Sequence, residues 1–219
     1  MIDSPVHDSS LLRHKLLEQL KSFLAARDFF FLPEWNQFRR LTPAGFQSVI
    51  VSWSPYEDLS VLEVHLGVRH DAVENIAFPF TNGLPGFQQN SMTVVTPLSK
   101  LFGEPYQRFG VQTEEDVQQA VKEILNRLST RGVSFLEKYS RLEAVDTLFN
   151  AQPSEPTPLI HNQVHRCLRA IAIARLSLRR DFESLGGFYR RQLKNLCAPE
   201  PIIERYERLL LYLRSYSHN

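Results

Sequence analysis

The sequence predicts an α+β fold in which helices cover one face of an antiparallel sheet of about four strands, followed by a C-terminal helical unit. Residues 59–69 alternate apolar and polar side chains, as a strand with one buried face does. Residues 113–128 repeat apolar side chains at helical spacing, and such a helix can cover that face. The composition, 43% hydrophobic and 22% charged over 219 residues, is typical of a globular chain.

The first predicted element is a helix over residues 9–27, where leucines recur at helical spacing. The aromatic segment 29–41 is interrupted by Pro33, so it predicts two short strands. Residues 46–69 then predict a hairpin, because two runs of strand character flank the turn-forming residues 54–58.

Less regular segments follow the hairpin. Residues 71–77 predict one or two helical turns. Residues 79–90 are rich in proline, glycine and asparagine and predict a long loop. Two further short strands are predicted, at residues 92–96 and 108–111.

Helical pattern returns with residues 113–128. Thr113 can cap this helix, and the three acidic residues 114–116 favour the positive end of its dipole. Gly132 interrupts the pattern. The sequence Ser140-Arg-Leu-Glu143 matches a capping box and predicts a further short helix.

The best candidate for a domain boundary is residues 151–158, which contain three prolines. It divides an α+β domain, residues 1–150, from a helical C-terminal unit, residues 159–219. Residues 1–158 carry 14 Lys and Arg against 19 Asp and Glu, a net charge of −5, whereas residues 159–219 carry 11 against 5, a net charge of +6. The two parts could therefore neutralise each other across an interface.

The sequence also predicts where helices begin and break within the C-terminal unit. Thr157-Pro158 predicts the cap and first turn of a helix, Gly186-Gly187 predicts a break or kink, and the last helix is predicted at about 200–215. Arg175 falls inside the apolar arc of its helix. We expect it to pair with a carboxylate of the last helix or to contact a partner, since an unpaired buried guanidinium is costly.

Motifs of several enzyme classes are absent from the sequence. It has no Walker A loop, no G-x-G-x-x-G, no G-x-S-x-G, no H-E-x-x-H and no EF-hand loop. Phosphate cradles and nucleophile elbows need glycines at fixed points, and the chain has only nine glycines. We therefore expect no catalytic residue of a familiar class and no cofactor.

Metal, redox and membrane features are equally sparse. His161 and His165 have the i,i+4 spacing of metal ligands on a helix, but no third ligand is near, so we expect an ordinary pair and no metal site. Cys167 and Cys197 form no disulfide framework. The first ten residues are polar and the longest apolar runs are five residues, so neither a signal peptide nor a membrane span is expected. These features favour a soluble, cytoplasmic protein with no membrane partner.

The first candidate site combines strand and loop residues. Glu63, His65 and Arg69 are predicted on the polar face of one strand, and His70 and Asp71 extend this cluster past the strand end. The cluster is either a small binding or acid–base site or a solvated face with cross-strand charge pairs. Phe87 lies in the loop at 79–90, and long loops often carry binding function, the alternative being a plain connector.

The second candidate site is a basic patch on the C-terminal helices. Its arginines are predicted away from the apolar stripe, where they could bind phosphate backbones. The alternatives are a solvated face or a face docked on the acidic part of the chain, which the overall net charge of +1 favours. The arginines in question are Arg166, Arg169, Arg180, Arg190 and Arg191.

One resemblance covers about residues 9–150. The order of LLEQLKSFLAARDFFF, NQFRRL, FQSVIVSW, LEVHLGVRH, TEEDVQQAVKEILNRL and DTLFN resembles an uncharacterised bacterial family of small α+β proteins, a domain of unknown function. The resemblance implies an α+β fold. That family has no established catalytic residues to carry over, and residues 159–219 lie outside the pattern.

Three functional hypotheses follow. The first is a non-enzymatic interaction module that binds another protein through the polar sheet face or the loop at 79–90. The second is an enzyme with an unfamiliar site around His65, with Glu63 or Asp71 as its partner. The third is nucleic-acid binding through the basic C-terminal helices, which we expect to be the less favoured of the two binding functions.

Overall fold

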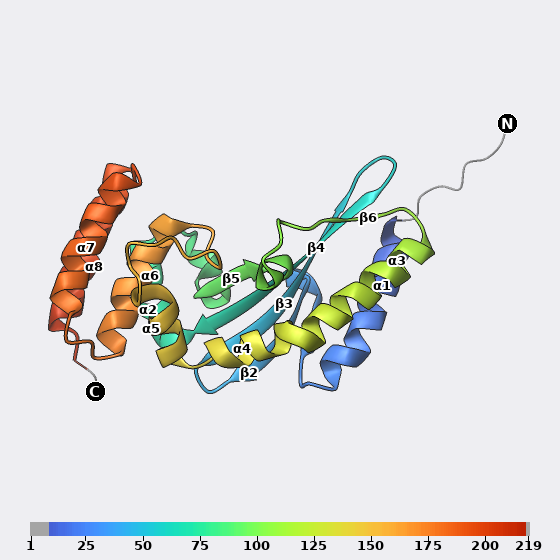
Figure 1. The fold of residues 1–219 in the computed structure, drawn as a ribbon, viewed down its shortest axis with the longest axis horizontal. Helices are drawn as coiled ribbons and strands as arrows, with labels where there is room; N and C mark the ends of the chain where they lie inside the picture. The colour runs from blue at the N-terminus through green and yellow to red at the C-terminus, as the bar shows by residue number, and fades with distance from the viewer. Residues whose placement is uncertain (1–8, 218–219) are drawn as a thin grey trace. The chain divides into compact units, whose positions relative to one another are not determined.

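The computed structural model describes residues 9–217, and the ribbon in Figure 1 follows them from helix α1 to helix α8. Residues 1–8, on which most of the expectation of no signal peptide rests, lie outside this range. The strands are β1 (Phe30–Leu32), β2 (Gln37–Thr42), β3 (Gly45–Pro55), β4 (Ser60–His70), β5 (Val94–Pro97) and β6 (Phe109–Val111).

Eight α-helices are present in the described residues: α1 (Ser9–Ala25), α2 (Asp71–Ala77), α3 (Glu114–Arg127), α4 (Val133–Tyr139), α5 (Leu142–Asn150), α6 (Gln163–Leu176), α7 (Phe182–Asn195) and α8 (Glu200–Ser215). Short 3₁₀ turns add η1 (Pro33–Trp35), η2 (Phe78–Phe80), η3 (Pro85–Asn90) and η4 (Leu98–Phe102), and η5 (Leu128–Gly132) is a π-helical turn.

The sheet has the strand order β1-β2-β3-β4-β5, and β6 pairs with β4. β1 and β2 are antiparallel with Phe31 opposite Phe38, and β4 and β6 are antiparallel with Leu62 opposite Phe109. Leu62, Val64 and Leu66 are buried, whereas the residues between them are partly exposed. The predicted α+β class is therefore confirmed, with an antiparallel sheet and a helical C-terminal unit, although the sheet in the described residues has six strands rather than about four.

The chain divides into two compact units. Unit 1 consists of the described residues of Met1–Leu41 with Gln47–Gly67 and Thr96–Leu136, and unit 2 consists of Thr42–Phe46, Val68–Val95 and the described residues of Glu137–Asn219. The predicted linker, residues 151–158, lies inside unit 2. The division into residues 1–150 and 159–219 stays a prediction.

In unit 1, helices α1 and α3 lie side by side (Figure 1). Leu12, Leu16, Leu20 and Leu24, four residues apart, are all buried, as the predicted helix requires. Thr113 caps α3: its hydroxyl accepts from the backbone N–H of Asp116, whose carboxylate accepts from the N–H of Thr113. This reciprocal capping box confirms the predicted helix start.

In unit 2, α6 is the central helix and contacts α2, α5, α7 and α8. The five consecutive residues 170–174 are fully buried, so α6 has no solvent face over this turn. The break predicted at Gly186-Gly187 is wrong, because α7 runs without interruption from Phe182 to Asn195. A Cβ at Gly186 would lie 2.9 Å from Leu210 Cδ1, so glycine serves the close approach of α8 rather than a bend.

Two predicted helix starts are also wrong. Arg141, not Ser140, is the N-cap of α5, and its side chain makes no capping bond. Helix α6 begins at Gln163 rather than after Thr157, because Asn162 is its cap: the Asn162 Oδ1 accepts from the N–H of His165 at 2.9 Å. The predicted interruption at Gly132 is the π-helical turn η5.

Candidate functional site

The loop at 79–90 is fastened by Arg69, which the sequence placed on the open polar face of its strand. That placement is wrong, because the Arg69 side chain is only 4% exposed. Its guanidinium donates to the backbone oxygens of Gln88 and Ser91, at 2.6 and 2.9 Å, and to the Ser91 hydroxyl at 2.8 Å. The segment that ends the loop therefore covers the end of β4 and buries the arginine.

Arg69 also keeps a carboxylate partner. Its Nε donates to Asp71 Oδ1 at 2.6 Å, and its second terminal nitrogen reaches Asn75 Oδ1 at 3.4 Å. The Asp71 carboxylate is largely exposed, so this pair has one buried and one solvated end. Arg69 and Asp71, both predicted site residues, act together as the anchor of the loop's C-terminal end.

The beginning of the loop is fastened separately. The Thr81 hydroxyl donates to the Phe78 oxygen at 2.8 Å and accepts from the Gly83 N–H at 3.2 Å. Arg205 of α8 donates to the Thr81 backbone oxygen at 2.6 Å, and Asn82 Oδ1 lies 3.0 Å from His165 Nε2 of α6. Both ends of the loop are thus held by hydrogen bonds to other elements of unit 2.

Between these anchors the loop presents apolar side chains to water. Leu84 is 67% exposed and Phe87 is 49% exposed. The Phe87 N–H donates to the Leu84 oxygen at 2.9 Å, and Pro85, which opens η3, fixes one backbone angle of this turn. A turn held in this way loses little conformational entropy when its side chains enter a partner's pocket.

Beneath the loop lies a buried ion pair that sequence reasoning missed. Glu74 of α2 is fully buried, and both its oxygens accept from Arg169 of α6, at 2.8 and 2.9 Å. Burial alone would raise the pKa of Glu74, but the Arg169 guanidinium, with hydrogen bonds from Ser91 and Thr93, holds it below its ordinary value. Ser91 therefore joins this pair to the Arg69 anchor.

The predicted basic patch does not exist as one surface. Arg169 is consumed by the ion pair with Glu74, and Arg166 is buried, donating to backbone oxygens that include that of Phe149 at 2.7 Å. The solvated alternative is therefore wrong for Arg166 and Arg169, and the pair of Arg169 with Glu74 fits the other alternative, a face docked on the acidic part of the chain. Arg180 and Arg191 are exposed, and Arg190 pairs with Glu207.

The polar sheet face holds a second cluster, in unit 1. The Tyr106 hydroxyl donates to Glu63 Oε2 at 2.5 Å and lies 3.4 Å from His65 Nε2, and Arg108 Nε donates to Glu63 Oε1 at 2.6 Å. Tyr106 and Arg108 were not singled out from the sequence. The available signal was their i,i+2 spacing immediately before the short strand β6, which pairs with β4.

The protonation states of this cluster are well separated. The hydrogen bonds from Tyr106 and Arg108 hold the pKa of Glu63 below its ordinary value. Burial lowers the pKa of His65, against the charge of Glu63, and burial together with the bond to Glu63 raises the pKa of Tyr106 to about 12. Near neutral pH the cluster therefore contains a carboxylate, a neutral imidazole and a neutral phenol.

Metal and thiol chemistry find little support in the described part of the chain. His161 precedes α6, so it does not share a helix face with His165, and residues 9–217 hold no group of three potential metal ligands. Burial raises the pKa of the Cys167 thiol to about 12, which makes it a poor nucleophile. No helix among the described residues is long and apolar enough to cross a membrane.

Comparisons with known proteins found no match to the chain among family models, curated proteins or solved structures.

Proposed function

We propose that this chain is a non-enzymatic binding module that recognises another protein through the loop at 79–90. The observation that carries the proposal is the exposure of Leu84 and Phe87 on a turn whose two ends are fastened by Arg69 and Arg205. Exposed aromatic and aliphatic side chains on a preorganised loop are typical of the energetic centre of an interface. The partner would offer an apolar pocket that admits both side chains.

The surroundings of the two side chains fit this proposal. Phe80, at the start of the loop, packs its ring 6.0 Å from that of Tyr212 on α8, and Tyr212 is 45% exposed. This contact packs the start of the loop against α8. Scattered exposed apolar residues need no explanation, whereas a group on one anchored surface favours an interaction site.

The experiment places a photocrosslinking amino acid at position 87 in cells and, as a matched control, at position 178. Leu178 is more exposed than Phe87, 70% against 49%, but lies between α6 and α7, outside the loop. The proposal expects one discrete crosslinked species from position 87 that position 178 does not give. It also expects Leu84→Ala, introduced beside the crosslinker, to reduce that species strongly. Equal crosslinking from both positions would contradict the proposal.

Location and origin are part of the proposal. The short apolar runs of the sequence, none longer than five residues, favour a cytoplasmic protein, and the resemblance of residues 9–150 favours a bacterial one. The resemblance assigns no role to any residue, so the proposed interface rests on the loop geometry.

A second candidate function is an enzyme site around His65. The observation in its favour is a neutral imidazole whose Nε2 lies 3.4 Å from the Tyr106 hydroxyl, beside the charged Glu63. A panel of chromogenic esters and phosphoesters, turned over by the wild type and by His65→Gln, tests it. Turnover that is lost in the variant supports the enzyme, and turnover equal in both excludes His65 as its base.

Nucleic-acid binding stays the weakest alternative, because only the exposed Arg180 and Arg191, together with the paired Arg190, remain of the predicted patch. Fluorescence anisotropy with labelled DNA and RNA at low salt tests it, and affinity that falls steeply with salt would support it.

A further inference from the structure

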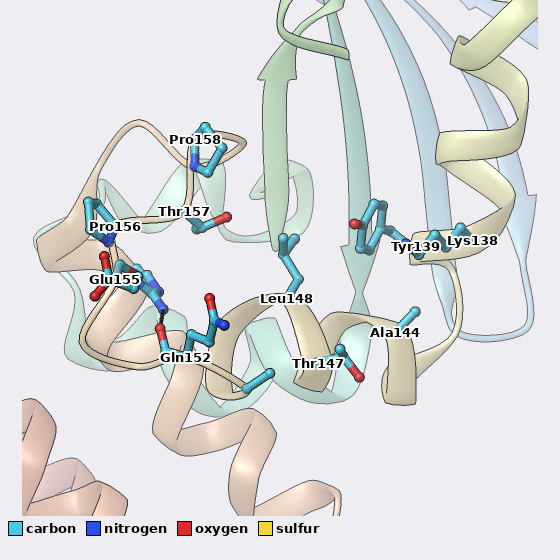
Figure 2. A pocket seen from close by; sticks show the side chains of 12 residues that line it. Lys138, Tyr139, Ala144, Thr147, Leu148, Gln152, Glu155, Pro156, Thr157 and Pro158 are labelled. Carbon is cyan, nitrogen blue, oxygen red and sulfur yellow. Dashed lines mark hydrogen bonds between the residues drawn. The ribbon is translucent and has the colours of Figure 1, made fainter. Parts of the chain in front are cut away.

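Unit 2 contains a pocket of about 430 Å³ that neither the interaction loop nor the sheet-face cluster uses. This volume is within the range of small-molecule sites. Its walls come from the end of α4, from α5, from residues 151–158 and from α6, and Figure 2 shows it from close by. The predicted linker is therefore one wall of a cavity.

Arg166 holds this wall in place. Its guanidinium donates to the backbone oxygens of Phe149, Gln152 and Glu155, at 2.7, 3.3 and 2.5 Å, and to Gln163 Oε1 at 3.2 Å. A cation at the C-terminal end of α5 also suits the helix dipole. These bonds occupy all four terminal N–H groups of Arg166, so its role is to shape the pocket. Its buried Nε–H is the one donor of this guanidinium without a partner among the described residues.

Two opposite charges remain available in the pocket. Within residues 9–217, neither the Lys138 ammonium nor the Glu155 carboxylate belongs to an ion pair, and the ammonium lies 5.1 Å from the centre of the Tyr139 ring. Figure 2 shows Lys138 and Glu155 at opposite sides of the pocket, with Gln152 and Thr157 between them. A ligand that satisfies both charges carries an anion at one end and a cation at the other.

The middle of the pocket suits a peptide unit. The side-chain amide of Gln152 and the hydroxyl of Thr157 make no hydrogen bond to other described residues, and they can donate to and accept from a backbone amide. Leu148, Pro156 and the Tyr139 ring supply apolar wall for a side chain. A ligand rich in phosphate fits poorly, because the terminal N–H groups of Arg166 already donate to protein acceptors and Lys138 is the other cation that lines the pocket.

We propose that this pocket binds a short peptide of two or three residues with free termini. Its amino terminus pairs with Glu155, its carboxylate with Lys138, and its amides with Gln152 and Thr157. A pocket of about 430 Å³ has room for a ligand of this size. This site is independent of the proposed interaction loop.

The test is isothermal titration of the full chain with the tripeptide Ala-Leu-Ala, its N-acetylated form and its C-terminal amide. The expected result is binding of the free tripeptide and about tenfold weaker binding of each blocked form. Glu155→Gln should weaken the free tripeptide tenfold but leave the acetylated form unchanged, and Lys138→Gln should do the same for the amide. Both side chains are exposed, so the variants should fold, which circular dichroism checks.

Matched controls are Glu115→Gln and Lys122→Gln, which remove equivalent exposed charges from α3 in unit 1. They should leave the affinity unchanged. No binding of the free tripeptide at millimolar concentration overturns the proposal. Equal affinity for the free and blocked peptides would also overturn it, and so would an equal loss of affinity in the control variants. Each result would show that the pocket charges do not recognise the peptide termini.

Discussion

Removing Arg169 is expected to destabilise the protein far more than an exposed arginine would. Glu74 is fully buried and Arg169 supplies both of its charged hydrogen bonds, at 2.8 and 2.9 Å. Arg169→Met keeps most of the side-chain volume but leaves a buried carboxylate without its countercharge. Breaking a buried pair in this way costs about 3–5 kcal/mol, against less than about 1 kcal/mol for an exposed pair.

The stability lost in Arg169→Met should depend on pH, and the pKa of Glu74 gives the direction of that dependence. In the wild type the pKa of Glu74 is lowered, so the pair contributes stability above the unfolded carboxyl's pKa and loses it as the pH falls through the folded value. In Arg169→Met, burial without the guanidinium raises that pKa instead. The folded variant then binds more protons than the unfolded chain, so its stability falls as the pH rises above the unfolded value.

Urea unfolding at pH 5 and pH 7 measures both effects. Arg169→Met should lose more stability, relative to wild type, at pH 7 than at pH 5. The double variant Glu74→Gln with Arg169→Met should recover part of the loss, because it removes the buried charge. A loss below about 1 kcal/mol at pH 7 would refute the reasoning, since that is the scale of a solvated pair. An equal loss at both pH values would refute it too.

Three further predictions concern other parts of the structure. Arg69→Met should speed amide hydrogen exchange in residues 84–91 at least tenfold, because the Gln88 and Ser91 backbone oxygens lose their donor, and it should not affect exchange in α1. Unchanged exchange in residues 84–91 would contradict the proposed anchor. Gly45→Ala should lower the free energy of unfolding by about 1–3 kcal/mol, since Gly45 has φ +147° and a Cβ would lie 2.4 Å from the Arg69 backbone oxygen. Gly110→Ala is the control in the same unfolding assay, and it should change stability little because the space around Gly110 is open. Tyr106→Phe should raise the pKa of Glu63 in a carboxyl NMR titration, and a constant pKa would show that the hydroxyl does not stabilise the carboxylate.

Local signals predicted much of the fold because each is read within a few residues. The leucines of α1, the alternation in β4 and the cap of α3 at Thr113 belong to this class. The start of α6 was mispredicted because Thr157-Pro158 and Asn162 are both good caps, and the helix uses Asn162.

The candidate sites were predicted less well, because they depend on contacts between distant segments. Arg69 reads as the next polar residue of an alternating strand, and its burial depends on residues 88–91 folding over it. Arg169 reads as a solvent-facing residue of its helix until α2 brings Glu74 to it. Tyr106 joins His65 only through the pairing of β6 with β4. No periodicity in one segment contains this information.

The anchored loop as a recognition surface is tested most directly by the affinity of the purified chain for the partner captured at position 87. Phe87→Ala and Leu84→Ala should each weaken the complex by about tenfold to a hundredfold, as energetic centres of interfaces do. Arg69→Met should weaken it as well, although Arg69 is buried, because the turn is then no longer preorganised. Affinities that remain within twofold of the wild type for all three variants would contradict the account.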